Sequence, residues 1–348
     1  MYKTRGKKGL FDEEFTKERL SAMGNPLEAI SKVVDFELFR KPLESKLLNT
    51  NKNNNAGAKP YDVVMLFKIL ILQRYYGLGD NQVEYQILDR ISFKTFLGLE
   101  TGDKVPDEKT VWSFRERITK TGLVEELFEQ FTSFLEKQEL IFNEGQLIDA
   151  SFTVAPRQRN TREENKKIKN GEGDNLWNDK PNKKKHKDID ARWTKKNGET
   201  FYGYKNHAKV DNRSKFINTY TVTDASVHDS QALDDLLDEK DKDQDLHADS
   251  AYTGEEQDKI VAKYEMKNKV HEKGYRNKPL TDEQKASNTK KSKIRARVEH
   301  VFGFMEQSMN GLVLKSVGMV RAAGIIGLIN LTYNLFRYEQ IKRLNITY

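Results

Sequence analysis

The eight residues Leu147-Ile-Asp-Ala-Ser-Phe-Thr-Val154 mark the point where the sequence changes from helical to strand-like patterns. Apolar, aromatic and β-branched residues dominate this short run, which favours a strand within a sheet. Asp149 stands in the middle of the run, between Ile148 and Ala150. A carboxylate among sheet residues is costly unless it is hydrogen-bonded, ion-paired or bound to a metal ion. The strand therefore decides the class of fold and provides the first candidate site residue.

The sequence before this strand is mostly helical. Asp62 is placed to cap a strongly apolar helix that continues through Tyr76, and a shorter helix is expected after Gly79. Another helix should follow Pro106. Short helices joined by glycine-containing turns are typical of helix-turn-helix bundles, and equally of helical domains that support an oligomer. We predict a helical domain over residues 1–140 that either binds DNA or mediates dimerisation.

The sequence after residue 141 alternates between strands and helices. The turn-forming stretch Asp211-Asn-Arg-Ser214 lies between two strand-like runs and predicts a hairpin. Later strands and helices alternate, which indicates crossover connections and a mixed sheet with helices on its faces. The expected strands are 147–154, 201–210, 216–223, a short one ending near 249, and 267–271; the expected helices are 230–237, 255–264, one around 294–305, and 325–336.

Charge is concentrated in one segment. The 348 residues carry a net charge of +7, with a pI of about 9.1 and no cysteine. Residues 157–200 contain 14 Lys and Arg against 8 Asp and Glu, a net charge of +6. We predict a flexible basic insertion, or one that DNA orders, with a solvated loop as the alternative. Disulfides and thiolate metal sites are excluded, and a cytoplasmic protein is expected.

Membrane insertion and secretion are not expected. The longest apolar run, Val63 to Leu72, contains Lys68 and is too short to span a bilayer. It is better explained as a buried helix. The basic start of the chain is followed by no apolar segment of the kind that a secretory signal requires.

Three carboxylates fall at related places in the predicted fold. Asp149 lies on the first strand, Asp249 follows a later strand, and Glu299 lies on a helix with the apolar stripe Ile294 to Met305. Ligands of such sheets collect at the carboxyl ends of strands, and all-oxygen sites suit hard divalent cations. Each residue alone has an ordinary explanation, namely a cap, a buried ion pair, or for Glu299 a helical pair with Arg295. Their order on one sheet is what favours a metal site.

Short motifs along nearly the whole chain resemble those of the DDE transposases of bacterial insertion sequences, in the group built around insertion sequence five. In the N-terminal part the motifs are Phe11-Asp-Glu-Glu-Phe15, Asn25-Pro-Leu-Glu28, Tyr61 to Gln73, and Asp107 to Arg115. In the remainder they are Leu147-Ile-Asp-Ala-Ser151, Asp190 to Lys196, Tyr202-Gly-Tyr-Lys-Asn-His207, Asp224 to Ser230, Ala248-Asp-Ser-Ala-Tyr252 and Arg295-Ala-Arg-Val-Glu299.

The resemblance implies an RNase H-like catalytic domain over residues 141–348, with the basic insertion inside it. Asp149, Asp249 and Glu299 would be the catalytic triad and hold two Mg²⁺ ions, with Mn²⁺ as a substitute. The implied reaction is an endonuclease cut at the transposon ends, followed by joining of the freed 3′-hydroxyl to target DNA. The partners would be double-stranded terminal inverted repeats and target DNA, bound by a homodimer on the bacterial nucleoid. A metal-dependent nuclease without strand transfer, or a non-catalytic DNA-binding derivative, are the alternatives.

Two positions depart from the family pattern. A Tyr is often found three residues before Arg295, and a Lys seven residues after Glu299; here these positions hold Ser292 and Glu306. Other cations must then meet the DNA. The candidates for DNA contact are Arg295, Lys205, Lys290, Lys291 and Lys293. Arg295 could also simply pair with Glu299 or Glu306, and Lys205 could lie on a solvated edge. His247, two residues before Asp249, is expected to contact a metal ligand rather than the metal.

Overall fold

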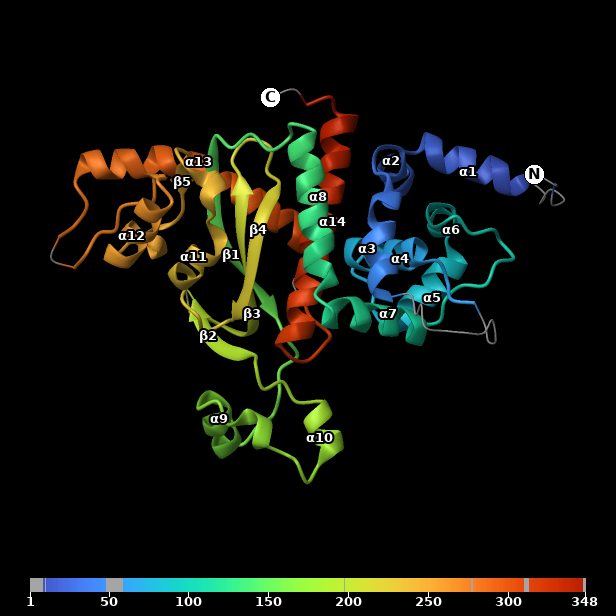
Figure 1. Cartoon of the computed structure of the whole chain (residues 1–348), viewed down its shortest axis with the longest axis horizontal. Coiled ribbons are helices and arrows are strands. Elements are labelled where there is room, and N and C mark those ends of the chain that lie inside the picture. The colour runs from blue at the N-terminus through green and yellow to red at the C-terminus, as the bar shows by residue number, and fades with distance from the viewer. Residues whose placement is uncertain are drawn as a thin grey trace, which may run out of the picture. The chain divides into compact units, whose positions relative to one another are not determined.

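The computed structural model describes residues 9, 11–47, 59–196, 198–276, 278–309 and 313–346 (Figure 1). The chain divides into two compact units. One comprises the described residues of Met1–Gln73, Leu78–Arg115 and Leu335–Thr347, and the other those of Arg74–Gly77 and Glu116–Asn334. Helices α7 (Glu108–Lys120) and α14 (Met319–Arg343) contribute residues to both units.

The first unit is helical, as the sequence predicts. Its further helices are α1 (Asp12–Ala22), α2 (Pro26–Val33), η1 (Phe36–Phe39), α3 (Arg40–Leu47), α4 (Val63–Tyr75), α5 (Asp80–Asp89) and α6 (Ile91–Leu97). The apolar helix α4 is buried along most of its length. Lys68 lies between the rings of Phe36 and Phe96, 5.1 and 5.2 Å from their centroids, and donates to the Phe96 carbonyl. The prediction of a buried helix here is confirmed; the role of this unit stays a prediction.

The second unit contains a mixed sheet. Its strands are β1 (Gly145–Val154), β2 (Arg192–Lys196), β3 (Glu199–Asp211), β4 (Ile217–Asp224), β5 (Asp245–His247) and β6 (Lys267–Asn268). The order is β4-β3-β1-β5-β6, and β2 pairs with the start of β3. The pairs β1–β3 and β3–β4 are antiparallel, whereas β5 runs parallel to β1 and β6 parallel to β5. This is the RNase H-like mixed sheet that the sequence predicts, with helices on its faces.

One face of the sheet packs against α8 (Leu123–Lys137) and the first part of α14. The rings of Phe128 and Tyr220 meet edge to face at 4.8 Å. Asn206 of β3 and Asn330 of α14 exchange two amide hydrogen bonds of 2.7 and 3.1 Å. Helix α14 is long and apolar enough to cross a membrane, but most of its apolar window is buried inside the protein, as in a core helix.

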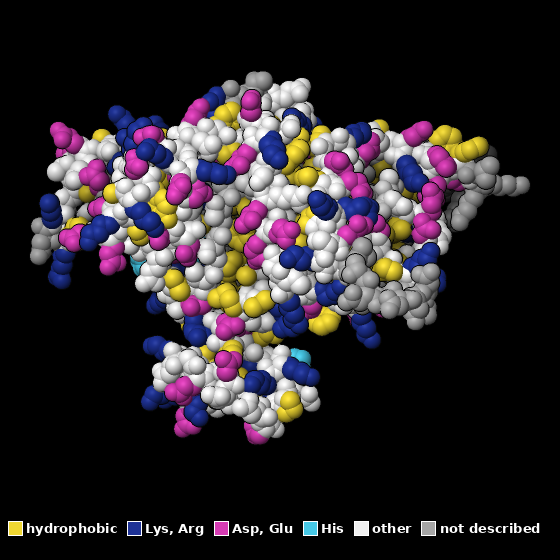
Figure 2. Space-filling model, in the orientation of Figure 1, with side chains coloured by type: hydrophobic (Ala, Val, Ile, Leu, Met, Phe, Trp, Pro, Cys, Tyr) yellow, Lys and Arg dark blue, Asp and Glu magenta, His cyan; other side chains and the backbone are white. Residues whose placement is uncertain are grey.

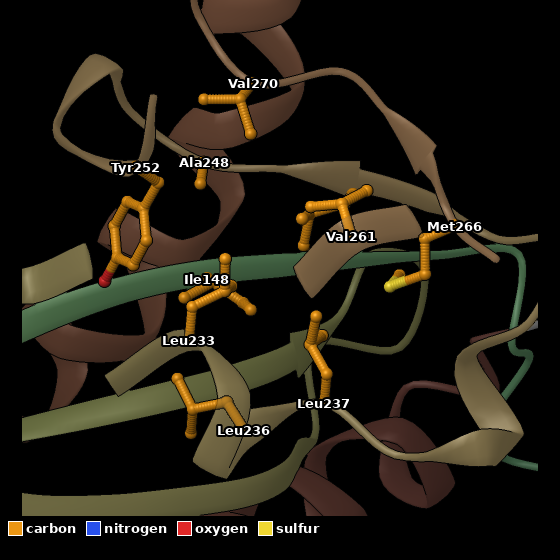
Figure 3. Packing of buried hydrophobic residues seen from close by; sticks show 10 residues of the cluster. Ile148, Leu233, Leu236, Leu237, Ala248, Tyr252, Val261, Met266 and Val270 are labelled. Carbon is orange, nitrogen blue, oxygen red and sulfur yellow. The ribbon is translucent and has the colours of Figure 1, made fainter. Parts of the chain in front are cut away.

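The other face carries a second apolar core. Helices α11 (Leu233–Leu236) and α12 (Glu255–Lys263) cover it, together with the short turns η3 (Asp229–Ala232), η4 (Glu239–Asp241) and η5 (Ser250–Tyr252). Ile148 of β1 points into this core and lies beside Leu233, with Tyr252 at its edge (Figure 3). Because side chains alternate along a strand, Ile148 and its neighbour Asp149 point to opposite faces.

Glycine is required at position 203, where β3 pairs with the end of β1. Gly203 has a φ of +150°, and a Cβ there would lie 2.2 Å from the Thr153 carbonyl oxygen and 2.7 Å from the Ala155 nitrogen. Only a residue without a side chain allows this approach. The antiparallel ladder thus reaches the end of β1, beyond Asp149.

The basic segment between β1 and β2 is folded, which corrects the expectation of a flexible or DNA-ordered insertion. It forms α9 (Arg162–Lys169), η2 (Gly173–Asn175) and α10 (Pro181–Lys185) around a small core of Ile168, Leu176 and Trp177. Trp177 donates to Glu164, and the ammonium groups of Lys183 and Lys187 lie over its ring. Figure 2 shows Lys and Arg side chains over this lobe, interspersed with acidic ones. The contacts of Trp177 with Glu164, Lys183 and Lys187 thus hold together a segment whose composition alone suggests no fold.

Candidate active site

The candidate site lies where β1 extends past the end of β5. The pairing of β1 with β5 ends at Leu147 and His247, so the next residues of β1 have no strand on that edge. Asp149 lies further along β1, and Asp249 follows the end of β5. One oxygen of Asp249 accepts the Ala251 amide at 2.8 Å, which caps η5. The chain thus places Asp249 just past the carboxyl end of β5, where ligands of such sheets bind, and Asp149 on the adjoining part of β1.

Asp149 is largely buried, and burial has a direct electrostatic effect. Desolvation raises its pKa to about 6, and the charge of Asp249 adds to the rise. The Ala150 amide, which donates to Asp149 at 2.8 Å, and the positive charges of Arg295 and Lys196 oppose it. A carboxylate that is costly to ionise without a cation is well suited to bind one.

Glu299 reaches the same region from α13 (Asp282–Gln307). The predicted apolar stripe docks this helix, since Val298, Val301 and Met305 are fully buried. Helix α13 contacts both β1 and β5. Glu299 itself lies at the flank of the helix, with 57% of its side chain exposed. It is therefore held near the strand ends without being buried.

Arg295 connects two of the three carboxylates. Its Nη1 donates to Oδ2 of Asp149 at 3.2 Å, and its Nη2 donates to Oε1 of Glu299 at 2.8 Å. The expected helical pair with Glu299 is present, and the contact with Asp149 adds a long-range partner. The guanidinium thus stands between two carboxylates where a cation is needed.

The donor set suits a hard divalent cation, although the three carboxylates are not gathered around one point. Among the residues that the structure describes, no three His, Cys, Asp or Glu side chains are grouped closely enough to hold a metal ion. The chemistry still fits, because Asp149, Asp249 and Glu299 offer only oxygen ligands and Asp149 is buried beside a second carboxylate. Arg295 occupies the space between Asp149 and Glu299 in this arrangement.

A cleft of about 340 Å³ opens beside Glu299. Its lining residues come from β1, β2, the start of β3 and α13, and they are Ala150, Ser151, Phe152, Lys196, Glu199, Phe201, Glu299, Phe302, Gly303 and Glu306. Phe152 and Phe201 stack in parallel, 4.3 Å between centroids. Glu306, which stands where the family often has a Lys, faces the same space as Glu299.

The predicted DNA-contacting lysines separate into two groups. Lys205 is buried and donates to Asp229 and to the Val227 carbonyl at 2.7 and 2.6 Å, so its assignment to a DNA-facing edge is wrong. Lys291 donates to the Val270 carbonyl and lies 3.7 Å from Glu272. Lys290 and Lys293 are exposed on α13 and do not line the cleft.

His247 does not show the predicted contact with a carboxylate of the triad. It is buried, its Nε2 lies 4.0 Å from Asp245, and its Nδ1 has no hydrogen-bond partner in the described structure. Tyr252 ends the motif Ala248-Asp-Ser-Ala-Tyr252, three residues after Asp249. Burial, together with Asp229, Asp149 and Asp249, raises its pKa well above the usual range, and no described atom accepts its hydroxyl proton.

Two family models match this chain. Residues 14–117 match the family model described as Transposase domain (DUF772), and residues 142–335 match the one described as Transposase DDE domain. The chain is also similar to a solved piggyBac transposase synaptic complex with hairpin DNA, with a TM-score of 0.44 and 10% identity, covering 93% of this chain and 77% of that one. The second match spans more than half of the chain and includes Asp149, Asp249 and Glu299. The chain belongs to the transposase DDE domain family.

Proposed function

We propose that this transposase-family protein cuts the ends of a transposable DNA segment and joins the freed 3′-hydroxyl to target DNA in one site. The observation that carries the proposal is the meeting of two strands and a helix: Asp149 lies on β1 beyond the end of its pairing with β5, Asp249 follows β5, and Arg295 joins Asp149 to Glu299. Family membership supports the same reading.

Asp149, Asp249 and Glu299 would hold two Mg²⁺ ions, or Mn²⁺ in their place. When bound, the ions supply activation of the attacking oxygen and neutralisation of the phosphate. Water breaks the phosphodiester bond at the transposon end, and the 3′-oxygen leaves as a hydroxyl. That hydroxyl then attacks a target phosphodiester, and a new 3′-hydroxyl leaves. Because both nucleophiles are DNA or water, no side chain forms a covalent bond to DNA.

Arg295 has two uses in this scheme. Without DNA it neutralises Asp149 and Glu299, which lie on different elements. With a phosphate in the cleft, the same planar guanidinium provides a two-donor fork for it. We propose that it exchanges carboxylate partners for DNA, in the cytoplasm of a bacterial cell, within a homodimer that brings two transposon ends together.

The test uses the purified chain and a plasmid that carries its coding sequence with the native flanking DNA. In Mg²⁺ we expect cuts at both flanks, and joined products when a precut end with a 3′-hydroxyl is supplied. Asp149→Asn, Asp249→Asn and Glu299→Gln should each abolish both products. Glu283→Gln, an exposed position in the first turn of the same helix, is the matched control.

Each other outcome would point to an alternative function. Cuts without joined products from the precut end would identify a nuclease. Binding to the flanks without cuts would identify a non-catalytic derivative. Cleavage that persists in Asp149→Asn would exclude the carboxylate site altogether.

A further inference from the structure

Helix α13 brings negative charge to the cleft where DNA phosphate is expected. Glu299 and Glu306 both line it, and Glu199 faces it from the start of β3. Two of these three carboxylates have no part in the triad. A phosphodiester approaching this space needs a cation close by.

One lining residue supplies that charge. Among the described residues of the cleft, Lys196 alone is positively charged. It is the last residue of β2 and pairs with Glu199 of β3. Its ammonium lies 5.7 Å from the centroid of Phe152, so the side chain reaches across the sheet surface towards β1.

Among the described residues, Lys196 has no carboxylate partner. It is exposed and forms no ion pair within the part of the chain that the structure describes. Its charge nevertheless opposes the rise in the pKa of Asp149, which places it within electrostatic reach of the triad.

The other nearby cations are occupied. Arg295 is held by Asp149 and Glu299, and Lys205 by Asp229. A phosphate in the cleft could recruit Lys196 without breaking a salt bridge.

We propose that Lys196 binds a phosphate of the DNA strand in this cleft, and so replaces, from β2, the lysine that the family often places on the catalytic helix at position 306. The inference rests on the proposed function, because it assigns a partner to the same site. It names a substrate-binding residue on β2, a strand inside the segment that was predicted as a basic insertion.

The neighbouring residue provides a matched control. Lys195 pairs with Thr200 and, since side chains alternate, points to the opposite face from Lys196. Both lysines are exposed, so neither Ala variant should disturb folding, which thermal unfolding verifies. The probe is a labelled duplex that carries the terminal sequence cut by the wild-type protein, with Ca²⁺ in place of Mg²⁺ for binding.

We expect Lys196→Ala to weaken binding about five- to tenfold at low salt and to reduce the slope of log affinity against log salt by about 0.9, as for one lost phosphate contact. Lys196→Arg should restore the slope, and Lys195→Ala should leave it unchanged. In cleavage, KM should rise more than kcat falls.

A relocation variant makes the test sharper. Combining Lys196→Ala with Glu306→Lys moves the positive charge to α13 and should recover the lost salt dependence. An unchanged slope in Lys196→Ala, or equal losses in the two Ala variants, would overturn the assignment while leaving the transposase function intact. A wild-type protein that cuts no flanking DNA would overturn both.

Discussion

The guanidinium of Arg295 lies 3.2 Å from the carboxylate of Asp149, which precedes it by 146 residues in the chain. Because the same group also holds Glu299, a divalent cation that binds these two carboxylates together competes with Arg295 for them. One positive charge of the protein itself thus offsets part of the negative charge of the site.

Removing this internal cation should strengthen metal binding. An ion pair of this kind is worth about 1 kcal/mol, which corresponds to about fivefold in affinity. We expect Arg295→Ala to bind Mn²⁺ about fivefold more tightly in the absence of DNA, as followed by the loss of the free Mn²⁺ signal in electron paramagnetic resonance. Arg297→Ala, which loses contacts only with Asn212, is the control. Weaker binding in Arg295→Ala would mean instead that the arginine orients the carboxylates.

Asp149 should make the metal-free protein less stable as pH rises. Its folded pKa is about 6, above its ordinary 3.8, so the folded state holds a proton that the unfolded chain has released between these values. Stability from this group is then fully present below about pH 4 and lost above about pH 6. The shift is about two pH units, or on the order of 2 to 3 kcal/mol.

Asp149→Asn removes this cost. In the presence of a chelator it should raise the free energy of unfolding at pH 7.5 by on the order of 2 kcal/mol, and by much less at pH 4.5, as measured by urea denaturation. Glu299→Gln, at a largely exposed position, should change stability little. Equal effects of Asp149→Asn at the two pH values would show that burial does not perturb this group.

Position 203 of β3, which pairs with the end of β1, should tolerate no side chain. Gly203→Ala places a methyl group against backbone atoms of Thr153 and Ala155, which must shift, and we expect a loss of about 2 kcal/mol or more. Gly303→Ala on α13 meets nothing within 4 Å and should gain about 0.5–1 kcal/mol from helix propensity. Thermal unfolding of the two variants should thus move in opposite directions.

The stability of the folded basic lobe should depend on Asp188. This buried carboxylate accepts the Tyr204 hydroxyl at 2.8 Å and the amides of Ala191 and Gly318 at 2.9 and 3.1 Å. Asp188→Ala leaves several buried donors without a partner and should cost about 2–4 kcal/mol. Limited proteolysis should then cut within residues 157–187 much faster, whereas Tyr204→Phe should have a smaller effect. Unchanged proteolysis would show that the small core around Trp177 is sufficient.

The local patterns predicted most of the sheet. The strands over 201–210 and 216–223 are confirmed as β3 and β4, and the apolar stripe that docks α13 is confirmed by burial. Helix prediction was less accurate near residue 230, where η3 and a single turn of α11 replace the expected helix. The strand expected over 267–271 is only β6, Lys267–Asn268. These elements are short, so tertiary contacts rather than periodicity set their lengths.

Long-range partners could not be predicted. The alternation of side chains along β3 predicts which of them share a face of the sheet. Only the three-dimensional structure shows that Asp229 lies on the same side as Lys205 and accepts a hydrogen bond from it. The folded structure of the basic lobe was not predicted because its core residues Ile168, Leu176 and Trp177 are separated by charged residues and follow no helical or strand periodicity. The contact between Arg295 and Asp149 joins residues far apart in the chain, whereas that between Arg295 and Glu299 followed from helical spacing.

The basic lobe leaves the sheet after β1 and returns through β2, so both of its connections lie at one end of the same antiparallel ladder. Its length can change without altering the register of β1 with β3, or the position of Asp149. Evolution can therefore exchange this segment as a cassette.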